Sequence, residues 1–241
     1  MTTKPIKDYL VFALDVPTRD DAIDWLDRLD GQVGSVKIGL ELFIACGPSL
    51  IETARQYGYQ VILDLKLHDI QETVERAMDR IGGLGVRYTT IHALGGPEMV
   101  KRAIAGAKGR TTPLAVTILT SHNEASLRAM GVFHEVTTAE LVDNLSSMAH
   151  EAGARGFVCS AEEVAALRLY APESTLMVPG IRLADGTAND QKRVATPQAA
   201  IAQGADLLVI GRPIRDSKDP IQTLKEIHEH VEVGLAARAV T

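Results

Sequence analysis

The chain has 241 residues, of which 46% are hydrophobic and 23% charged, and its formal net charge at pH 7 is −6. The acidic balance argues against nucleic acid or an anionic membrane as the main partner. The N-terminal MTTKPIKDYL lacks the apolar core of a signal peptide, and no run approaches the roughly 18 apolar residues of a membrane span. Cys46 and Cys159 are too few for a disulfide framework or a thiolate metal cage, so we expect reduced thiols in a cytoplasmic protein.

Short apolar runs rich in Val, Ile and Leu alternate with amphipathic segments along the whole chain. The runs predict strands at 9–16, 35–40, 60–67, 88–94, 113–119, 156–161, 175–181 and 206–212. Nearly continuous apolarity is typical of parallel strands covered on both faces. Eight strand–helix units in this length predict an α/β fold, a (β/α)8 TIM barrel forming one domain over 1–241. A doubly wound open sheet is the alternative. Segments 120–136 and 182–195 are longer than plain connections, as expected of substrate-contacting loops.

The third predicted strand is unusual, because charged residues interrupt its apolar run, VILDLKLHDI at 61–70. Strand alternation places its leucines on one face and Asp64, Lys66 and His68 on the other. If the leucines meet the surrounding helices, Asp64 and Lys66 point into the barrel near its carboxyl end. Alone, this pair could be a structural ion pair.

Two earlier strands add charges at the same end of the barrel. Asp15 ends the first strand and Lys37 lies in the second, so Asp15, Lys37, Asp64 and Lys66 can form an alternating array. Such charges hold one another ionised and can stabilise a charge that develops on a substrate. His92, at the end of the fourth strand, is compatible with either a pocket position or a structural hydrogen bond.

The last two strands indicate an anion site. VPGIR ends the seventh with Gly180 and Arg182, and IGRPI ends the eighth with Gly211 and Arg212. Loops after strands 7 and 8 form the usual phosphate site of such barrels, where glycine lets backbone N–H groups approach and arginine adds forked donors. The alternative is that both arginines are solvated. We therefore expect a phosphorylated small molecule as ligand.

Other common site motifs do not occur. The chain has no P-loop, no G-x-G-x-x-G after the first strand and no H-E-x-x-H helix. Ser160 lacks the context of a nucleophile elbow. Nucleotide-triphosphate, dinucleotide and zinc-protease chemistry are thus not indicated.

The stretch DLKLHDI matches the D-x-K-x-x-D-I signature of the orotidine 5′-phosphate decarboxylase family. The resemblance extends from FALDVP through VKIGLELF, IHALGG, TILTS, VCSAEE, VPGIR and DQKR to VIGRPI, and its order and spacing are similar to the bacterial branch. It implies a homodimer with shared active sites that decarboxylates orotidine 5′-monophosphate to UMP and CO2 in de novo pyrimidine biosynthesis, with neither cofactor nor metal.

The resemblance also implies a role for each member of the array. Lys66 would protonate C6 of the pyrimidine as the carboxylate leaves, and Asp64 would flank it near the substrate carboxylate. Lys37 would contact both Asp64 and the ribose, and Asp15 would hold a ribose hydroxyl.

Three residues after the array would serve the neighbouring subunit. The resemblance assigns Asp69, with Ile70 and Thr73, to the partner's site across the dimer interface. The family usually reads Pro-Asn-Thr after the signature, whereas this chain has Gln71-Glu72-Thr73. The turn into the next helix, and any contact of the usual Asn, therefore stay open.

The remaining implied substrate contacts follow strands 5, 7 and 8, and are Thr120 or Ser121, Pro179, Arg182, Gln191, Gly211 and Arg212. Thr120 or Ser121 would meet the pyrimidine edge. Gln191 and Arg212 would grip the phosphate with the Gly211 amide, and Arg182 would support the closed state.

Two rival functions have different requirements. Mg²⁺-dependent relatives, such as a keto-gulonate-phosphate decarboxylase or a hexulose-phosphate aldolase, would place a carboxylate at the end of strand 2, where Lys37 would repel the cation. A non-catalytic phosphate-ligand binding protein would not need the Asp64, Lys66 and Asp69 set.

Overall fold

The computed structural model describes residues 4–122, 124–129, 131, 136–183 and 195–239. Within them, eight parallel strands close into a barrel in chain order, with β8 pairing back to β1. The strands are β1 (Leu10–Ala13), β2 (Ser35–Gly39), β3 (Gln60–Leu67), β4 (Tyr88–His92), β5 (Thr112–Val116), β6 (Gly156–Val158), β7 (Thr175–Val178) and β8 (Leu207–Ile210). The predicted (β/α)8 barrel is confirmed, and the open sheet is wrong. That the domain takes in all of 1–241 stays a prediction.

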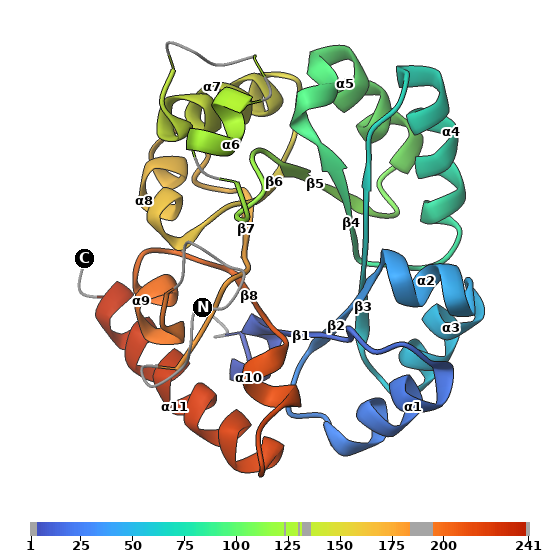
Figure 1. The fold of residues 1–241 in the computed structure, drawn as a ribbon, viewed down its shortest axis with the longest axis vertical. Helices are drawn as coiled ribbons and strands as arrows, with labels where there is room; N and C mark the ends of the chain where they lie inside the picture. The colour runs from blue at the N-terminus through green and yellow to red at the C-terminus, as the bar shows by residue number, and fades with distance from the viewer. Residues whose placement is uncertain (1–3, 123, 130, 132–135, 184–194, 240–241) are drawn as a thin grey trace.

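Helices surround the barrel, as Figure 1 shows. They are α1 (Arg19–Arg28), α2 (Leu40–Cys46), α3 (Ser49–Gln56), α4 (Gln71–Gly82), α5 (Gly96–Ala107), α6 (Glu124–Ala129), α7 (Thr138–Glu151), α8 (Ala161–Tyr170), α9 (Pro197–Ala202), α10 (Arg212–Arg215) and α11 (Pro220–Arg238), with 3₁₀ turns η1 (Ile6–Tyr9) and η2 (Ala93–Gly95). The N-terminus of α1 is capped by Thr18, whose hydroxyl accepts from the Asp21 amide. No helix in the described part of the chain combines the length and apolarity needed to cross a membrane.

Strand alternation divides the core into two layers. On β1, Leu10 and Phe12 pack outward with the helices, whereas Val11 and Ala13 belong to the cluster inside the barrel. The inner cluster fills the barrel below the carboxyl ends of its strands, so the barrel is a packed core rather than a pore. Inward positions at the carboxyl ends of the strands are the ones left for polar side chains.

The pairing of β3 with β4 is irregular, although Leu63, Leu65 and Leu67 pack with the outer core and Asp64 and Lys66 face the barrel mouth, as predicted. Leu63 pairs with Thr89 and Leu67 with Ile91, so residues 64–66 of β3 lie opposite Thr90 alone. Within this bulge Lys66 has φ 49°, in the left-handed region. His68 lies beyond the bulge and is exposed. That His68 shares the inward face with Asp64 and Lys66 stays a prediction.

Predicted strands run past the observed ends on the carboxyl side. β1 ends at Ala13 rather than at 16, and β7 ends at Val178 rather than at 181. The backbone leaves the ladder there to form the βα loops, although the sequence stays apolar. The short helices α2 and α10, directly after β2 and β8, were not predicted.

Candidate active site

A cavity of about 320 Å³ opens at the carboxyl ends of the strands. Its lining residues follow or belong to all eight strands and are Ala13, Asp15, Lys37, Asp64, Lys66, Thr90, Val116, Ile118, Leu119, Thr120, Val158, Met177, Pro179, Gly180, Arg182, Val209, Gly211, Arg212 and Arg215. This is the face where barrel enzymes hold their active sites, and the volume suits a small molecule.

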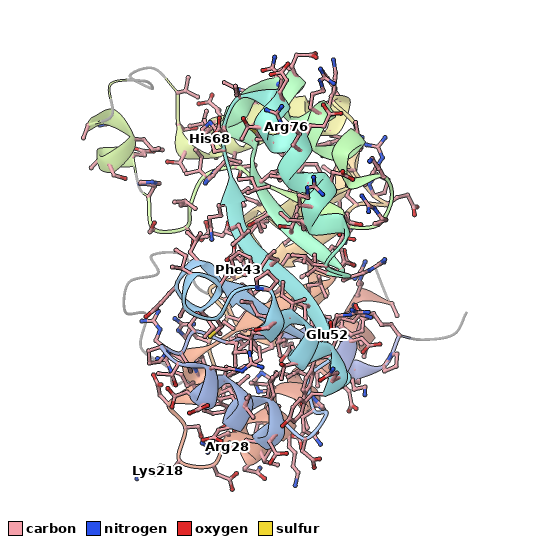
Figure 2. All side chains as sticks on the ribbon, turned by 90° about the vertical axis from the view of Figure 1, so that its right-hand side faces the viewer. Arg28, Phe43, Glu52, His68, Arg76 and Lys218 are labelled. Carbon is pink, nitrogen blue, oxygen red and sulfur yellow. The ribbon has the colours of Figure 1, made fainter. Side chains whose placement is uncertain are left out.

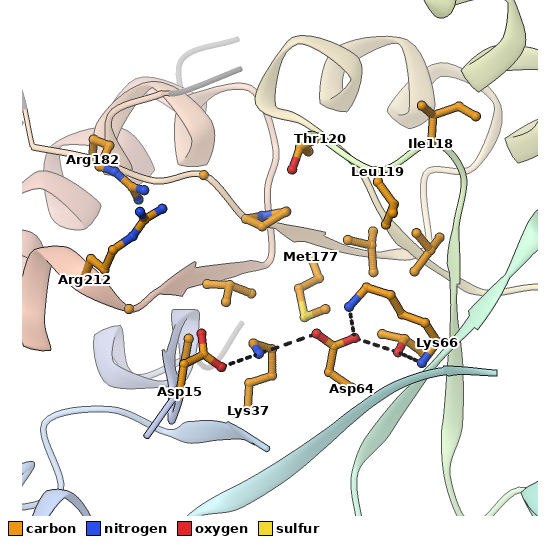
Figure 3. A pocket seen from close by; sticks show the side chains of 18 of the residues that line it. Asp15, Lys37, Asp64, Lys66, Ile118, Leu119, Thr120, Met177, Arg182 and Arg212 are labelled. Atoms are coloured by element: carbon orange, nitrogen blue, oxygen red, sulfur yellow. Dashed lines mark hydrogen bonds and ion pairs between the residues drawn. The ribbon is translucent and has the colours of Figure 1, made fainter. Parts of the chain in front are cut away.

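One wall of the cavity is the predicted array of charges (Figure 3). Lys37 Nζ lies 3.1 Å from Asp15 Oδ1 and 3.5 Å from Asp64 Oδ2. Lys66 Nζ lies 2.7 Å from Asp64 Oδ1. The four side chains thus form a continuous chain, acid–base–acid–base, contributed by three neighbouring strands.

The array keeps its inner members charged. Burial alone would lower the pKa of Lys37, but the Asp64 and Asp15 carboxylates outweigh it and raise that pKa. Burial alone would raise the pKa of Asp64, but Lys37 and Lys66, with hydrogen bonds from Lys66 and Thr90, hold it below its ordinary value. Lys37 and Asp64 are therefore both held in their charged forms, and the Lys66 side chain ends the array.

The replacement Asp64→Asn is expected to lower the free energy of unfolding at pH 7 by about 3 kcal/mol, because two lysines lose their shared counter-charge. The folded-state pKa of Asp64 lies below its ordinary value of 3.8, so its stabilisation is complete above pH 3.8 and is lost as pH falls through the lower folded value. Urea unfolding should be measured from pH 7 to pH 2. The difference in the free energy of unfolding between wild type and variant should shrink in that acid range.

Replacing the exposed Asp24 by Asn is the matched control. Its free energy of unfolding should differ little from that of wild type, and this difference should not shrink in the acid range. A difference for Asp64→Asn that stays constant down to pH 2 would contradict the coupling.

The opposite end of the cavity is cationic. Figure 3 shows the guanidinium groups of Arg182 and Arg212 directed toward one another. Arg182 is only 8% exposed and its Nη1 donates to the Ile181 carbonyl, 2.7 Å away, so it is not the solvated side chain of the alternative reading. Gly211 lies close to β1, because a Cβ there would come 3.1 Å from the Ala13 Cβ. The predicted anion site is thus assembled from the ends of β7 and β8.

The cavity also has apolar walls. Val116, Ile118, Val158 and Met177 are among its lining residues. A ligand that fits all three parts carries an anionic group, polar groups and a flat or apolar portion. This is the chemistry of a phosphorylated nucleoside-sized molecule.

Thr120 and Pro179, both predicted contacts, line the cavity, whereas Ser121 is exposed and does not. Of the two residues left open for the pyrimidine edge, the structure therefore places Thr120 at the cavity. Gln191 lies outside the described residues.

Asp69, Ile70 and Thr73 do not line their own chain's cavity. The Asp69 carboxylate accepts from the Ile70 amide, 2.7 Å away, and Ile70 is 65% exposed. All three residues lie at the start of α4, outside the barrel mouth of their own chain.

His92 also lies outside the cavity lining. Its ring centroid is 5.6 Å from that of His68, and its buried Nδ1 has no hydrogen-bond partner among the described residues. Burial, with the neighbouring His68 and Lys66, lowers the His92 pKa. The pocket role is therefore wrong, and Nδ1 does not make the alternative structural hydrogen bond.

Sequence reasoning missed two polar residues of the cavity. The Thr90 hydroxyl donates to Asp64 Oδ1 at 2.8 Å, and Arg215 donates to the Asp15 carbonyl at 2.9 Å. Thr90 lies within a strand that reads as ordinary core, and Arg215 lies on the unpredicted helix α10. The inward alternation of β4 was the one available signal for Thr90.

Neither Cys46 nor Cys159 forms a disulfide. In the described ranges, no group of three or more His, Cys, Asp or Glu side chains is placed to hold a metal ion. Between Asp15 and Asp64, where two carboxylates could converge on a cation, the Lys37 ammonium is already present.

Comparisons with known proteins give consistent matches. A family model described as "Orotidine 5'-phosphate decarboxylase / HUMPS family" matches residues 8–227. The orotidine 5'-phosphate decarboxylase of Trichlorobacter lovleyi is 41% identical over 242 residues, covering 98% of this chain and 100% of the relative. That of Anaeromyxobacter sp. (strain K) is 46% identical over 216 residues, covering 89% of this chain and 94% of the relative.

Solved structures are similar over the same length. The crystal structure of orotidine 5'-phosphate decarboxylase from Lactobacillus acidophilus has a TM-score of 0.81 at 35% identity, covering 93% of this chain and 99% of that one. An uncharacterized conserved protein from Geobacillus kaustophilus has a TM-score of 0.79 at 30% identity, covering 92% and 99%.

Proposed function

The chain belongs to the orotidine 5′-phosphate decarboxylase / HUMPS family, and from this premise we propose that it decarboxylates orotidine 5′-monophosphate to UMP and CO2 in pyrimidine biosynthesis. The observation that carries the proposal is the Asp15–Lys37–Asp64–Lys66 chain, which ends with an ammonium inside a cavity that has two arginines at its other end. Mg²⁺-dependent chemistry would need oxygen ligands where Lys37 is.

The proposed chemical step moves one electron pair and one proton. The bond between C6 and the carboxylate breaks, CO2 leaves, and the electron pair stays on C6. The Lys66 ammonium stabilises this developing carbanion and gives C6 its proton, so UMP forms and Lys66 regains a proton from water. Asp64, which is fixed by Lys37 and Lys66, orients the ammonium and lies beside the departing carboxylate.

Binding uses the rest of the cavity. Arg212, the Gly211 amide and Gln191 would grip the phosphate, and Arg182 would support the closed state. Asp15 and Lys37 would hold the ribose, Thr120 the pyrimidine edge, and Pro179 a further contact. Phosphate binding far from C6 supplies energy that assembles the charged site. No cofactor takes part in this scheme, and we place the enzyme in the cytoplasm.

An exposed apolar patch supports the proposed homodimer. Leu40 and Ile44 on α2, Ile70 before α4 and Leu94 on η2 are 51%, 79%, 65% and 45% exposed. They follow the carboxyl ends of three adjacent strands, β2, β3 and β4. Figure 2 views this side, where β3 runs between the α2–α3 pair and α4. Exposed apolar side chains that cluster in this way mark interaction surfaces.

The same side gives access to the array. A second cavity, of about 250 Å³, contacts Asp15, Lys37, Asp64 and Lys66 from the α2 side, and Leu40 lines it. A partner that covers the patch would therefore bring its own residues close to the array. We propose that the partner's Asp69, Ile70 and Thr73 complete the site in this way.

Product analysis tests the reaction. Purified protein incubated with orotidine 5′-monophosphate should give UMP and CO2 in equal amounts, detected by chromatography and CO2 capture. Hexulose phosphates and keto-gulonate phosphate should stay unchanged under the same conditions. Conversion of a sugar phosphate with no conversion of the nucleotide would replace this proposal with the rival one.

A further inference from the structure

The hydroxyl of Thr90 bonds to both members of the Asp64–Lys66 pair. Thr90 Oγ1 accepts a hydrogen bond from the Lys66 amide at 2.9 Å and donates its own proton to Asp64 Oδ1 at 2.8 Å. The side chain is 1% exposed, so water does not compete for either bond. The direction of both bonds is fixed, because a backbone amide can only donate and the hydroxyl has a single proton.

The position of Thr90 in the sheet explains why a side chain is needed here. Residues 64–66 of β3 face Thr90 alone across the register shift, so the β3–β4 ladder is interrupted at the two charged residues. The Lys66 amide would otherwise lose its ladder partner beside a buried carboxylate. The Thr90 hydroxyl takes the place of that backbone acceptor.

The Lys66 backbone is also strained. Of the described non-glycine residues with positive φ, Asp30 and Lys108 lie in turns after helices, and Lys66 alone lies within a strand. A residue with a long side chain keeps a left-handed conformation only where its surroundings impose it. The hydrogen bond from its amide to Thr90 is a contact that imposes it.

We infer that Thr90 is a positioning residue for decarboxylation, one that fixes the Lys66 backbone in the bulge and the Asp64 carboxylate in its rotamer, and so sets the direction of the Lys66 ammonium. This rests on the proposed function, in which that ammonium meets C6. Asp64 Oδ1 receives both the Lys66 ammonium and the Thr90 hydroxyl, so losing the hydroxyl removes one hydrogen bond from each member of the pair at once.

The chain provides a matched control in the adjacent residue. Thr89 is 0% exposed and its hydroxyl also donates a 2.8 Å hydrogen bond, but to the Leu63 carbonyl on the outer side of the barrel. Thr89 does not line the cavity. Thr89→Val and Thr90→Val therefore each remove one buried hydroxyl from β4 at nearly constant volume, and only the second touches the charged pair.

The test compares kcat for orotidine 5′-monophosphate with the Kd of UMP in both variants, at a temperature where circular dichroism shows all proteins folded. Thr90→Val is expected to lower kcat about 100-fold through misplacement of Lys66, with UMP affinity within about threefold of wild type. Thr89→Val should keep kcat within about threefold even if its Tm falls. Thr90→Ser, which keeps the hydroxyl, should restore most of kcat.

Several outcomes would overturn the inference. They are a Thr90→Val enzyme with wild-type kcat, a Thr90→Ser enzyme as slow as Thr90→Val, or equal kcat losses in Thr89→Val and Thr90→Val. If Thr90→Val does not fold, Thr90→Ala is used instead, and wild-type kcat in that variant overturns the inference equally. An inactive wild type would overturn the proposed function and this inference together, whereas an active wild type with an active Thr90→Val overturns the inference alone.

Discussion

Replacing Lys66 with alanine is expected to abolish turnover, lowering kcat by about 10⁴-fold or more, while the Kd of UMP changes by less than about tenfold. The variant loses both the proton donor and the cation that stabilises the carbanion, yet the arginine end of the cavity is untouched. Stopped assays over hours and calorimetric titration with UMP separate the two quantities. Lys101→Ala is the control, since Lys101 pairs with Glu98 on the outer helix α5 and should behave as wild type.

A Lys66→Ala enzyme that keeps a tenth of wild-type kcat would show that another group protonates C6. A variant that loses both kcat and UMP binding would instead make Lys66 a binding residue. Lys37, whose ammonium lies 3.5 Å from Asp64 Oδ2, would be the next candidate donor in the first case.

Mixing inactive Lys66→Ala and Asp69→Ala subunits is expected to restore about one quarter of wild-type activity. If each site takes Lys66 from one subunit and Asp69 from its partner, a mixed dimer has one intact site and one doubly defective site. Random exchange makes half of the dimers mixed, and half of their sites are intact. The measurement is kcat after dissociation and reassociation of an equimolar mixture, with mixed dimers counted by a tag on one variant.

Ile44→Asp provides the structural control, because a charge at this 79% exposed position of the apolar patch should separate the subunits and remove the restored activity. Leu169→Asp, at an 87% exposed position on α8, should leave the dimer intact. If mixed dimers form in the expected number but no activity returns, Asp69 belongs to the active site of its own subunit.

The barrel and the four-member array could be predicted because each depends on local pattern. Strands buried on both faces read as apolar runs, and a closed barrel brings the ends of strands 1, 2 and 3 together. These two facts are enough to predict that Asp15, Lys37, Asp64 and Lys66 come together. The arginines after β7 and β8 followed from the same topology.

The bulge in β3 could not be predicted in this way. Nothing in LDLKL marks Lys66 as left-handed, because the residue with positive φ is a lysine rather than a glycine. The bulge depends on Thr90, which is 24 residues away in sequence, and local pattern does not carry such a pairing.

The apolar side chains of the proposed dimer surface were missed for a different reason. Ile44 lies on a short helix that was not predicted. The sequence alone also does not show whether an isolated apolar residue such as Ile70 is buried or exposed. The closed barrel shows that these residues follow the ends of three adjacent strands, β2, β3 and β4.

We propose that the charged array decarboxylates without a metal, and the absorbance change of orotidine 5′-monophosphate in excess EDTA measures whether it does. Wild-type protein stripped of metals should convert the nucleotide at the same kcat with EDTA, without EDTA and with added Mg²⁺. No turnover, or turnover that appears only when Mg²⁺ is restored, would contradict the assignment of the chemistry to Lys66 and its neighbours.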